Sequence, residues 1–186
     1  MIIQVKDEIV EQATSYSNAV YEYDRKESMK KPYCQKEDDH IGYIVEFHIL
    51  DFLGMKLPSI TNILDQNDLV FNDMKIDVKG TKYTNPHLIV RTAYTRKKDV
   101  THYLLGRYDK KAKIITILGI IAKKEFLEKS VYNKTITPYI KSPILHWSKL
   151  YPFELPKQEE EPFEEVIDRL ETKKISGSVN LRDLFK

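Results

Sequence analysis

Cysteine and long apolar runs are scarce in this sequence, and each scarcity excludes a class of protein. The 186 residues include one cysteine, Cys34, which excludes an intramolecular disulfide and a zinc site built from cysteines. The five histidines never show the H-E-x-x-H spacing of a zinc protease. The longest strongly apolar run, residues 114–122, is far shorter than the roughly 18 residues of a membrane span, and no signal peptide is visible. We therefore expect a soluble, cytoplasmic protein of a reducing compartment.

The charge of the chain is nearly balanced, but its two parts differ in sign. There are 30 Lys and Arg residues and 28 Asp and Glu residues, a net charge of +2. Residues 157–186 hold six Lys or Arg and eight Asp or Glu, which leaves +4 on the rest. This mild basic bias is compatible with nucleic-acid binding without establishing it. The sequence predicts a domain at 1–156 and an acidic tail at 157–186, with an amphipathic helix at 163–172.

Hydrophobic periodicity predicts a mixed α/β chain. Apolar residues at helical spacing predict helices over residues 7–22 and about 40–53. The second helix is apolar on both sides and is therefore expected to be buried. Asp38 or Asp39 is predicted as its N-cap, and Gly54 is suited to its end. Further predicted elements are a loop at 24–37, strands at 68–71, 74–79, 87–94, 100–108 and 112–119, a short helix from residue 122, and an extended proline-rich flap at 131–156.

The segment 68–79, DLVFNDMKIDVK, predicts a β-hairpin that carries unusual charges. A two-residue turn at 72–73, Asn-Asp, places Asp68 directly opposite Asp77. One face of this hairpin is wholly apolar, which supports the register: Leu69, Phe71, Met74, Ile76 and Val78. Two opposed carboxylates destabilise a sheet unless a cation lies between them. Oxygen ligands of this kind are those of Mg²⁺ and Mn²⁺, so the pair predicts a metal site.

Two further residues extend this predicted site. Lys79 shares the face of Asp77, a position from which it can orient a water nucleophile or stabilise charge on phosphoryl oxygens. Glu46 lies in an apolar stripe of the second helix, where a carboxylate is costly unless paired or bound to metal. Gly42, one turn earlier, leaves room for close approach. A buried ion pair is nearly as good an interpretation of Glu46 as a catalytic role.

The order of these residues resembles that of the PD-(D/E)XK nuclease superfamily. A glutamate on a helix precedes an aspartate on one strand and Asp-x-Lys on the paired strand. The matching residues are Glu46 in GYIVEF, Asp68 in NDLVF, and Asp77 and Lys79 in IDVKG. The resemblance covers about residues 40–120. It implies a restriction-endonuclease-like core, which is a central mixed β-sheet flanked by helices.

The resemblance also implies Mg²⁺- or Mn²⁺-dependent hydrolysis of DNA. The carboxylates of Glu46, Asp68 and Asp77 would hold the metal with the carbonyl of Val78, and Lys79 would orient the attacking water. The sequence departs from the family pattern because no proline precedes Asp68. It departs again because further strands precede the next helix.

Basic residues beside the predicted strands are candidates for contacts with DNA phosphates. They are Lys82, Arg96, Lys97 and Lys98, together with the turn at 110–113. Hairpin turns are usually charged whatever the function, so a solvated surface explains them equally well.

Two other hypotheses stay open. One is a catalytically inactive nuclease-like module that binds nucleic acid or a protein partner. The other is a structural or interaction protein with no nucleic-acid role, in which these acidic residues form no metal site. RNA as the substrate, a homodimer, and a protein partner bound through the tail are also left open by the sequence.

Overall fold

The computed structural model describes residues 1–28, 36–59, 69–90, 99–133 and 142–153. Residues Met1–Phe153 form one compact unit, and its class is mixed α/β, as predicted. The boundary predicted at residue 156 and the helix predicted at 163–172 lie outside the described residues and stay predictions. The described elements are β1 (Ile2–Gln4), α1 (Asp7–Ser28), α2 (Lys36–Phe52), β2 (Leu69–Phe71), β3 (Met74–Thr81), β4 (His87–Ile89), β5 (His102–Asp109), β6 (Ile114–Ala122), α4 (Lys123–Lys129), β7 (Val131–Tyr132), β8 (Pro143–His146) and the 3-10 helix η2 (Trp147–Lys149).

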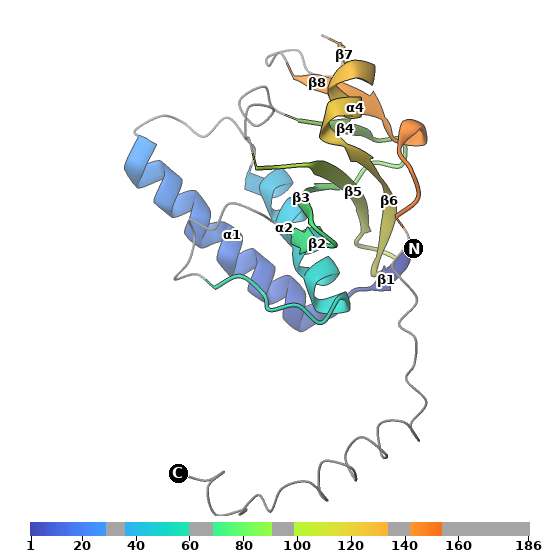
Figure 1. Ribbon diagram of the computed structural model, residues 1–186. Coiled ribbons are helices and arrows are strands. Elements are labelled where there is room, and N and C mark those ends of the chain that lie inside the picture. Colours follow the sequence, from blue (N-terminus) through green and yellow to red (C-terminus); the bar gives the residue numbers. More distant parts are fainter. Residues whose placement is uncertain (29–35, 60–68, 91–98, 134–141, 154–186) are drawn as a thin grey trace, which may run out of the picture. The chain divides into compact units, whose positions relative to one another are not determined.

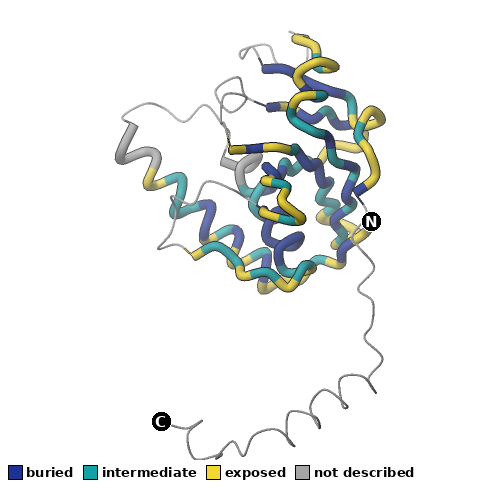
Figure 2. Tube along the Cα trace, viewed as in Figure 1, coloured by how far each residue is buried: buried dark blue, intermediate teal, exposed yellow. Residues whose placement is uncertain are grey.

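A curled five-stranded sheet forms the centre of this unit (Figure 1). Its strand order is β1-β6-β5-β3-β2, and β3 lies parallel to β5 while the other neighbours are antiparallel. The helices α1 and α2 lie side by side in Figure 1, and α2 packs against β3 and β5. In Figure 2 the most continuously buried stretches are the C-terminal half of α2 and the middle of the sheet. Among the described helices, none is long and apolar enough to cross a membrane.

The predicted hairpin is present, with the predicted turn and register. Asn72 and Asp73 have φ angles of 46° and 62°, so both occupy the left-handed region that a type I′ turn requires. The paired residues are those that the sequence predicts: Leu69 with Ile76, Val70 with Lys75, and Phe71 with Met74. Asp68, the next residue outward, lies outside the described residues.

Two glycines allow α2 to approach the sheet closely. A Cβ on Gly80 of β3 would lie 2.5 Å from the carbonyl oxygen of Ile41 and 2.8 Å from the Cα of Gly42. A Cβ on Gly106 of β5 would lie 2.5 Å from Cγ1 of Val45. The close approach expected at Gly42 is therefore made against β3. It follows that the even-numbered residues of β3 face α2, because side chains alternate along a strand.

The ends of the helices differ in part from prediction. Gly54, with φ of 65°, terminates α2 as predicted. The amide of Met55 donates to the Leu50 carbonyl and that of Gly54 to the Asp51 carbonyl, the two bonds of a Schellman motif. The N-cap prediction is wrong, because α2 begins at Lys36 and its first turns contain residues 38 and 39. The loop predicted from residue 24 is also wrong up to Ser28, since α1 continues to that residue.

Part of the predicted flap belongs to a second small sheet. Its strand order is β4-β8-β7, so residues 131–132 and 143–146 are paired, while Trp147–Lys149 form η2. Of the strand predicted at 87–94, residues 87–90 are described, and His87–Ile89 form β4. The strand β6 ends three residues later than predicted, at Ala122. A shared core joins this sheet to β5, β6 and α4: Leu88, Val90, Val100, Tyr103, Leu105, Ile121, Phe126 and Leu145.

A buried histidine joins α2 to the start of the chain. His48 is fully buried, and its Nε2 accepts the backbone N–H of Lys6 at 3.0 Å. Because Nε2 is an acceptor, the proton is on Nδ1, which donates to the carbonyl of Ile44 at 2.7 Å. Both ring nitrogens are thus satisfied only in the neutral imidazole. Burial lowers the pKa of His48 below its usual 6.5.

We expect His48 to make the fold less stable in acid. Below pH 6.5 the unfolded chain binds a proton at this residue while the folded protein does not, so the free energy of unfolding falls as pH falls toward the lowered pKa of His48. Above pH 6.5 both states are neutral and the stabilisation is fully present. Urea unfolding between pH 8 and pH 5 measures this slope. In His48→Gln, whose amide keeps one donor and one acceptor, the slope should be shallower, and an identical slope would contradict the assignment.

Candidate active site

Asp77 and Lys79 form a partly buried ion pair on β3. Nζ of Lys79 donates to Oδ1 of Asp77 at 2.6 Å. The Asp77 side chain is 9% exposed, whereas that of Lys79 is 28% exposed and reaches the surface. An ionised carboxylate at such depth is costly unless it is paired, and Lys79 supplies the compensating charge. The face of the hairpin that carries these two residues therefore holds a buried charge, unlike an ordinary solvated face.

The surroundings of Asp77 come from strand β5. Asp77 and Tyr103 are partners in the parallel pairing of β3 and β5, so both side chains lie on one face of the sheet. Tyr103 is fully buried, and its ring makes an edge contact with Phe126, with the centroids 5.1 Å apart. Burial, and secondarily the charge of Asp77, raises the pKa of Tyr103 to about 12. The phenol is therefore neutral and remains a hydrogen-bond donor at physiological pH.

Glu46 is buried on α2, as the sequence predicts, with 7% of its surface exposed. It lies one turn after Gly42, which contacts β3 at Gly80. Val45 and Ile49, which are near it on the same helix, are fully buried. The helix packs against the face of β3 that carries Gly80, whereas Asp77 and Lys79 alternate to the other face. The structure thus brings Asp77 and Lys79 together, but it places Glu46 on the helix that packs against the opposite face of β3.

Four other predicted site residues lie outside the described residues: Asp68, Arg96, Lys97 and Lys98. Lys82 is described and is exposed just beyond the end of β3. Within the described ranges, no three acidic, histidine or cysteine side chains are close enough to hold a metal ion. Their roles therefore stay predictions.

The donor atoms that are described nevertheless suit a hard cation. Asp77 offers a carboxylate and Val78 a backbone carbonyl, both of them oxygen ligands. Mg²⁺ is usually held by one or two carboxylates while it keeps several waters, so Asp77 and one further acid would suffice. Asp68 is the acid that the hairpin register predicts for that place.

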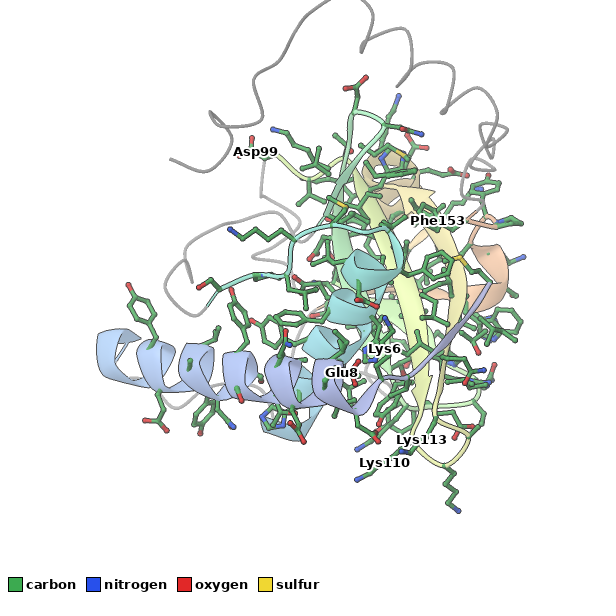
Figure 3. The ribbon with its side chains drawn as sticks, turned by 90° about the horizontal axis from the view of Figure 1, so that it is seen from below. Lys6, Glu8, Asp99, Lys110, Lys113 and Phe153 are labelled. Atoms are coloured by element: carbon green, nitrogen blue, oxygen red, sulfur yellow. The ribbon has the colours of Figure 1, made fainter. Side chains whose placement is uncertain are left out.

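Two basic residues at the opposite end of β5 and β6 have structural partners. Figure 3 shows Lys6, Lys110 and Lys113 at the end of the sheet where α1 begins. Lys113 pairs with Asp7 at 2.9 Å, and Lys6 pairs with Asp51 at 2.7 Å. The hydrogen bond to Asp7 raises the pKa of Lys113, and that to Asp51 raises the pKa of Lys6. Lys113, one of the three lysines in the turn at 110–113, therefore joins elements of the fold.

Comparisons with protein-family models, with curated proteins and with solved structures found no match to the chain.

Proposed function

We propose that this protein is a divalent-metal-dependent nuclease that hydrolyses phosphodiester bonds of DNA. The observation that carries the proposal is the buried Asp77, ion-paired with Lys79, on a strand whose hairpin has the predicted register. The order α2, β2, β3 supports it, because this helix-and-hairpin arrangement is the one expected for a restriction-endonuclease-like core. Buried carboxylates with a specific charged partner are concentrated at functional sites, which also supports the proposal.

Each residue has a definite part in the proposed reaction. Bound Mg²⁺ or Mn²⁺ would lower the pKa of a water and neutralise charge on the phosphate. Asp77 and the Val78 carbonyl, with Asp68, would hold the cation. The side chain of Lys79, which is hydrogen-bonded to Oδ1 of Asp77 in this structure, would turn to hold the attacking water or a phosphate oxygen. Exposed Lys82, with the cations at 96–98, would contact phosphates along the strand.

Neutralising Asp77 is expected to abolish cleavage. The protein is incubated with supercoiled plasmid, linear duplex, single-stranded DNA, a branched junction and single-stranded RNA, each with EDTA, Mg²⁺ or Mn²⁺. The wild type should cleave DNA only with a metal, and Asp77→Asn should be slower by at least about 100-fold, the usual loss for a group that stabilises the transition state.

Asp73→Asn is the matched control for this experiment. It makes the same substitution four residues away in the same hairpin, in an exposed turn position where asparagine also tolerates positive φ. Full activity in Asp73→Asn with none in Asp77→Asn would support the proposal. Metal-dependent cleavage by Asp77→Asn at the wild-type rate would overturn it. DNA binding without cleavage by the wild type would favour the inactive module instead.

A further inference from the structure

The buried hydroxyl of Tyr103 has no structural role among the residues that the structure describes. The side chain is fully buried in the core between the two sheets, and its ring is fixed by the edge contact with Phe126. Its hydroxyl oxygen is buried and has no hydrogen-bond partner among the described residues. A buried polar group without a partner lowers stability, and phenylalanine would fill the same space without that cost.

The position of this hydroxyl relates it to Asp77. The two residues are direct partners across β3 and β5 and lie on the same face, and neighbouring strands are only about 4.8 Å apart. The negative charge of Asp77 contributes to the raised pKa of Tyr103, although the two side chains share no hydrogen bond. The phenol is therefore close enough to feel the charge of the carboxylate, but it donates no hydrogen bond to it. One oxygen atom between them would satisfy the hydroxyl.

We propose that Tyr103 is a positioning residue of the Asp77 site, whose hydroxyl donates a hydrogen bond to a water or ligand oxygen held beside that carboxylate. This inference rests on the proposed function and deepens it. Oδ1 of Asp77 accepts a hydrogen bond from the ammonium of Lys79. Tyr103 lies on β5, which borders β3 on the side opposite β2. A cation bound at Asp77 keeps part of its water shell, and such a water is the oxygen that the phenol would fix.

The chemistry of the phenol restricts Tyr103 to the role of a hydrogen-bond donor. With a pKa of about 12 it stays protonated at the pH at which the protein works, so it donates a hydrogen bond and does not act as a base. Its burial also prevents it from contacting the bulk solvent. Loss of the hydroxyl should therefore weaken the binding of the hydrated cation and slow the reaction without disturbing the fold.

Tyr103→Phe tests the inference by metal binding as well as by activity. Mn²⁺ binding is followed through the loss of the free-ion electron paramagnetic resonance signal, and stability is followed by thermal unfolding without metal. We expect Tyr103→Phe to melt at or above the wild-type temperature, since an unpartnered hydroxyl is removed, and to bind Mn²⁺ about three- to tenfold more weakly, the loss of one hydrogen bond. Its kcat should fall while its KM for DNA stays unchanged.

Tyr108→Phe and Asp77→Asn complete the experiment. Tyr108 is on the same strand and also feels an aspartate, Asp7, but lies at the other end of β5, so its variant should bind Mn²⁺ like the wild type. Equal Mn²⁺ affinity in Tyr103→Phe and the wild type, with binding lost in Asp77→Asn, would overturn this inference and leave the proposed function standing. Wild-type affinity in Asp77→Asn would overturn both.

Discussion

Replacement of Gly80 by alanine is expected to destabilise the protein by about 3 kcal/mol, the cost of forcing an extra carbon into a closely packed contact. The new Cβ would lie 2.5 Å from the carbonyl oxygen of Ile41 and 2.8 Å from the Cα of Gly42. Both are backbone atoms of a buried helix, so no side-chain rotation relieves the overlap. The helix α2 must move away from β3, and Glu46 moves with it. Urea unfolding at pH 8 measures the loss.

Gly42→Ala is the control on the opposite side of the same contact. A Cβ on Gly42 meets nothing within 4 Å outside its own helix, and its φ is not in the left-handed region. Alanine should therefore stabilise α2 by about 0.5–1 kcal/mol, its ordinary advantage over glycine in a helix. Opposite signs in the two variants would establish that β3 and α2 meet backbone to backbone. Equal stability in Gly80→Ala and the wild type would show that they do not.

Lys79→Met is expected to tighten metal binding and nearly abolish cleavage. In the metal-free protein the ammonium of Lys79 lies 2.6 Å from Oδ1 of Asp77, where it competes with any other cation. Its removal leaves a buried carboxylate without compensation, so a divalent cation gains more by binding there. Cleavage should nevertheless slow by at least about 100-fold, because the charge that orients water or stabilises the phosphate is lost. Mn²⁺ titration and initial rates on the preferred DNA measure the two effects separately.

The control for this experiment is Lys75→Met in the same strand. Lys75 is an exposed lysine on the same face of β3, opposite Val70 near the turn. Its variant should match the wild type in both measurements. Weaker Mn²⁺ binding in Lys79→Met would mean that the lysine supports the cation rather than competing with it. Unchanged cleavage would remove Lys79 from the proposed mechanism.

Local patterns account for what the sequence predicts correctly. The turn at 72–73 and the alternation on either side of it determine the hairpin within ten residues. The burial of Glu46 follows from the apolar stripe around it, and the end of α2 follows from Gly54. The close spacing of Asp77 and Lys79 is inherent in an i, i+2 pair on a strand.

The remainder depends on contacts between distant segments. β1 has only three residues, too few to show a period, and it exists because β6 offers it an edge. The parallel pairing of β3 with β5 brings Tyr103 beside Asp77, and nothing in either strand specifies that partner. For this reason the site predicted from the sequence does not include Tyr103. Knowledge of the β3–β5 register would have found it, because the pairing of Asp77 then follows directly.

The pairing of β1 with β6 also determines when the fold can be completed. Ile3 lies opposite Ile115, so the first strand of the chain is the partner of a strand made more than a hundred residues later. During synthesis β1 has no edge to join until β6 has left the ribosome, and contacts this distant in sequence form slowly. In the nascent chain, β2 and β3 can therefore form their hairpin early, whereas β1, at the opposite edge of the sheet, can pair only after β6 has been made.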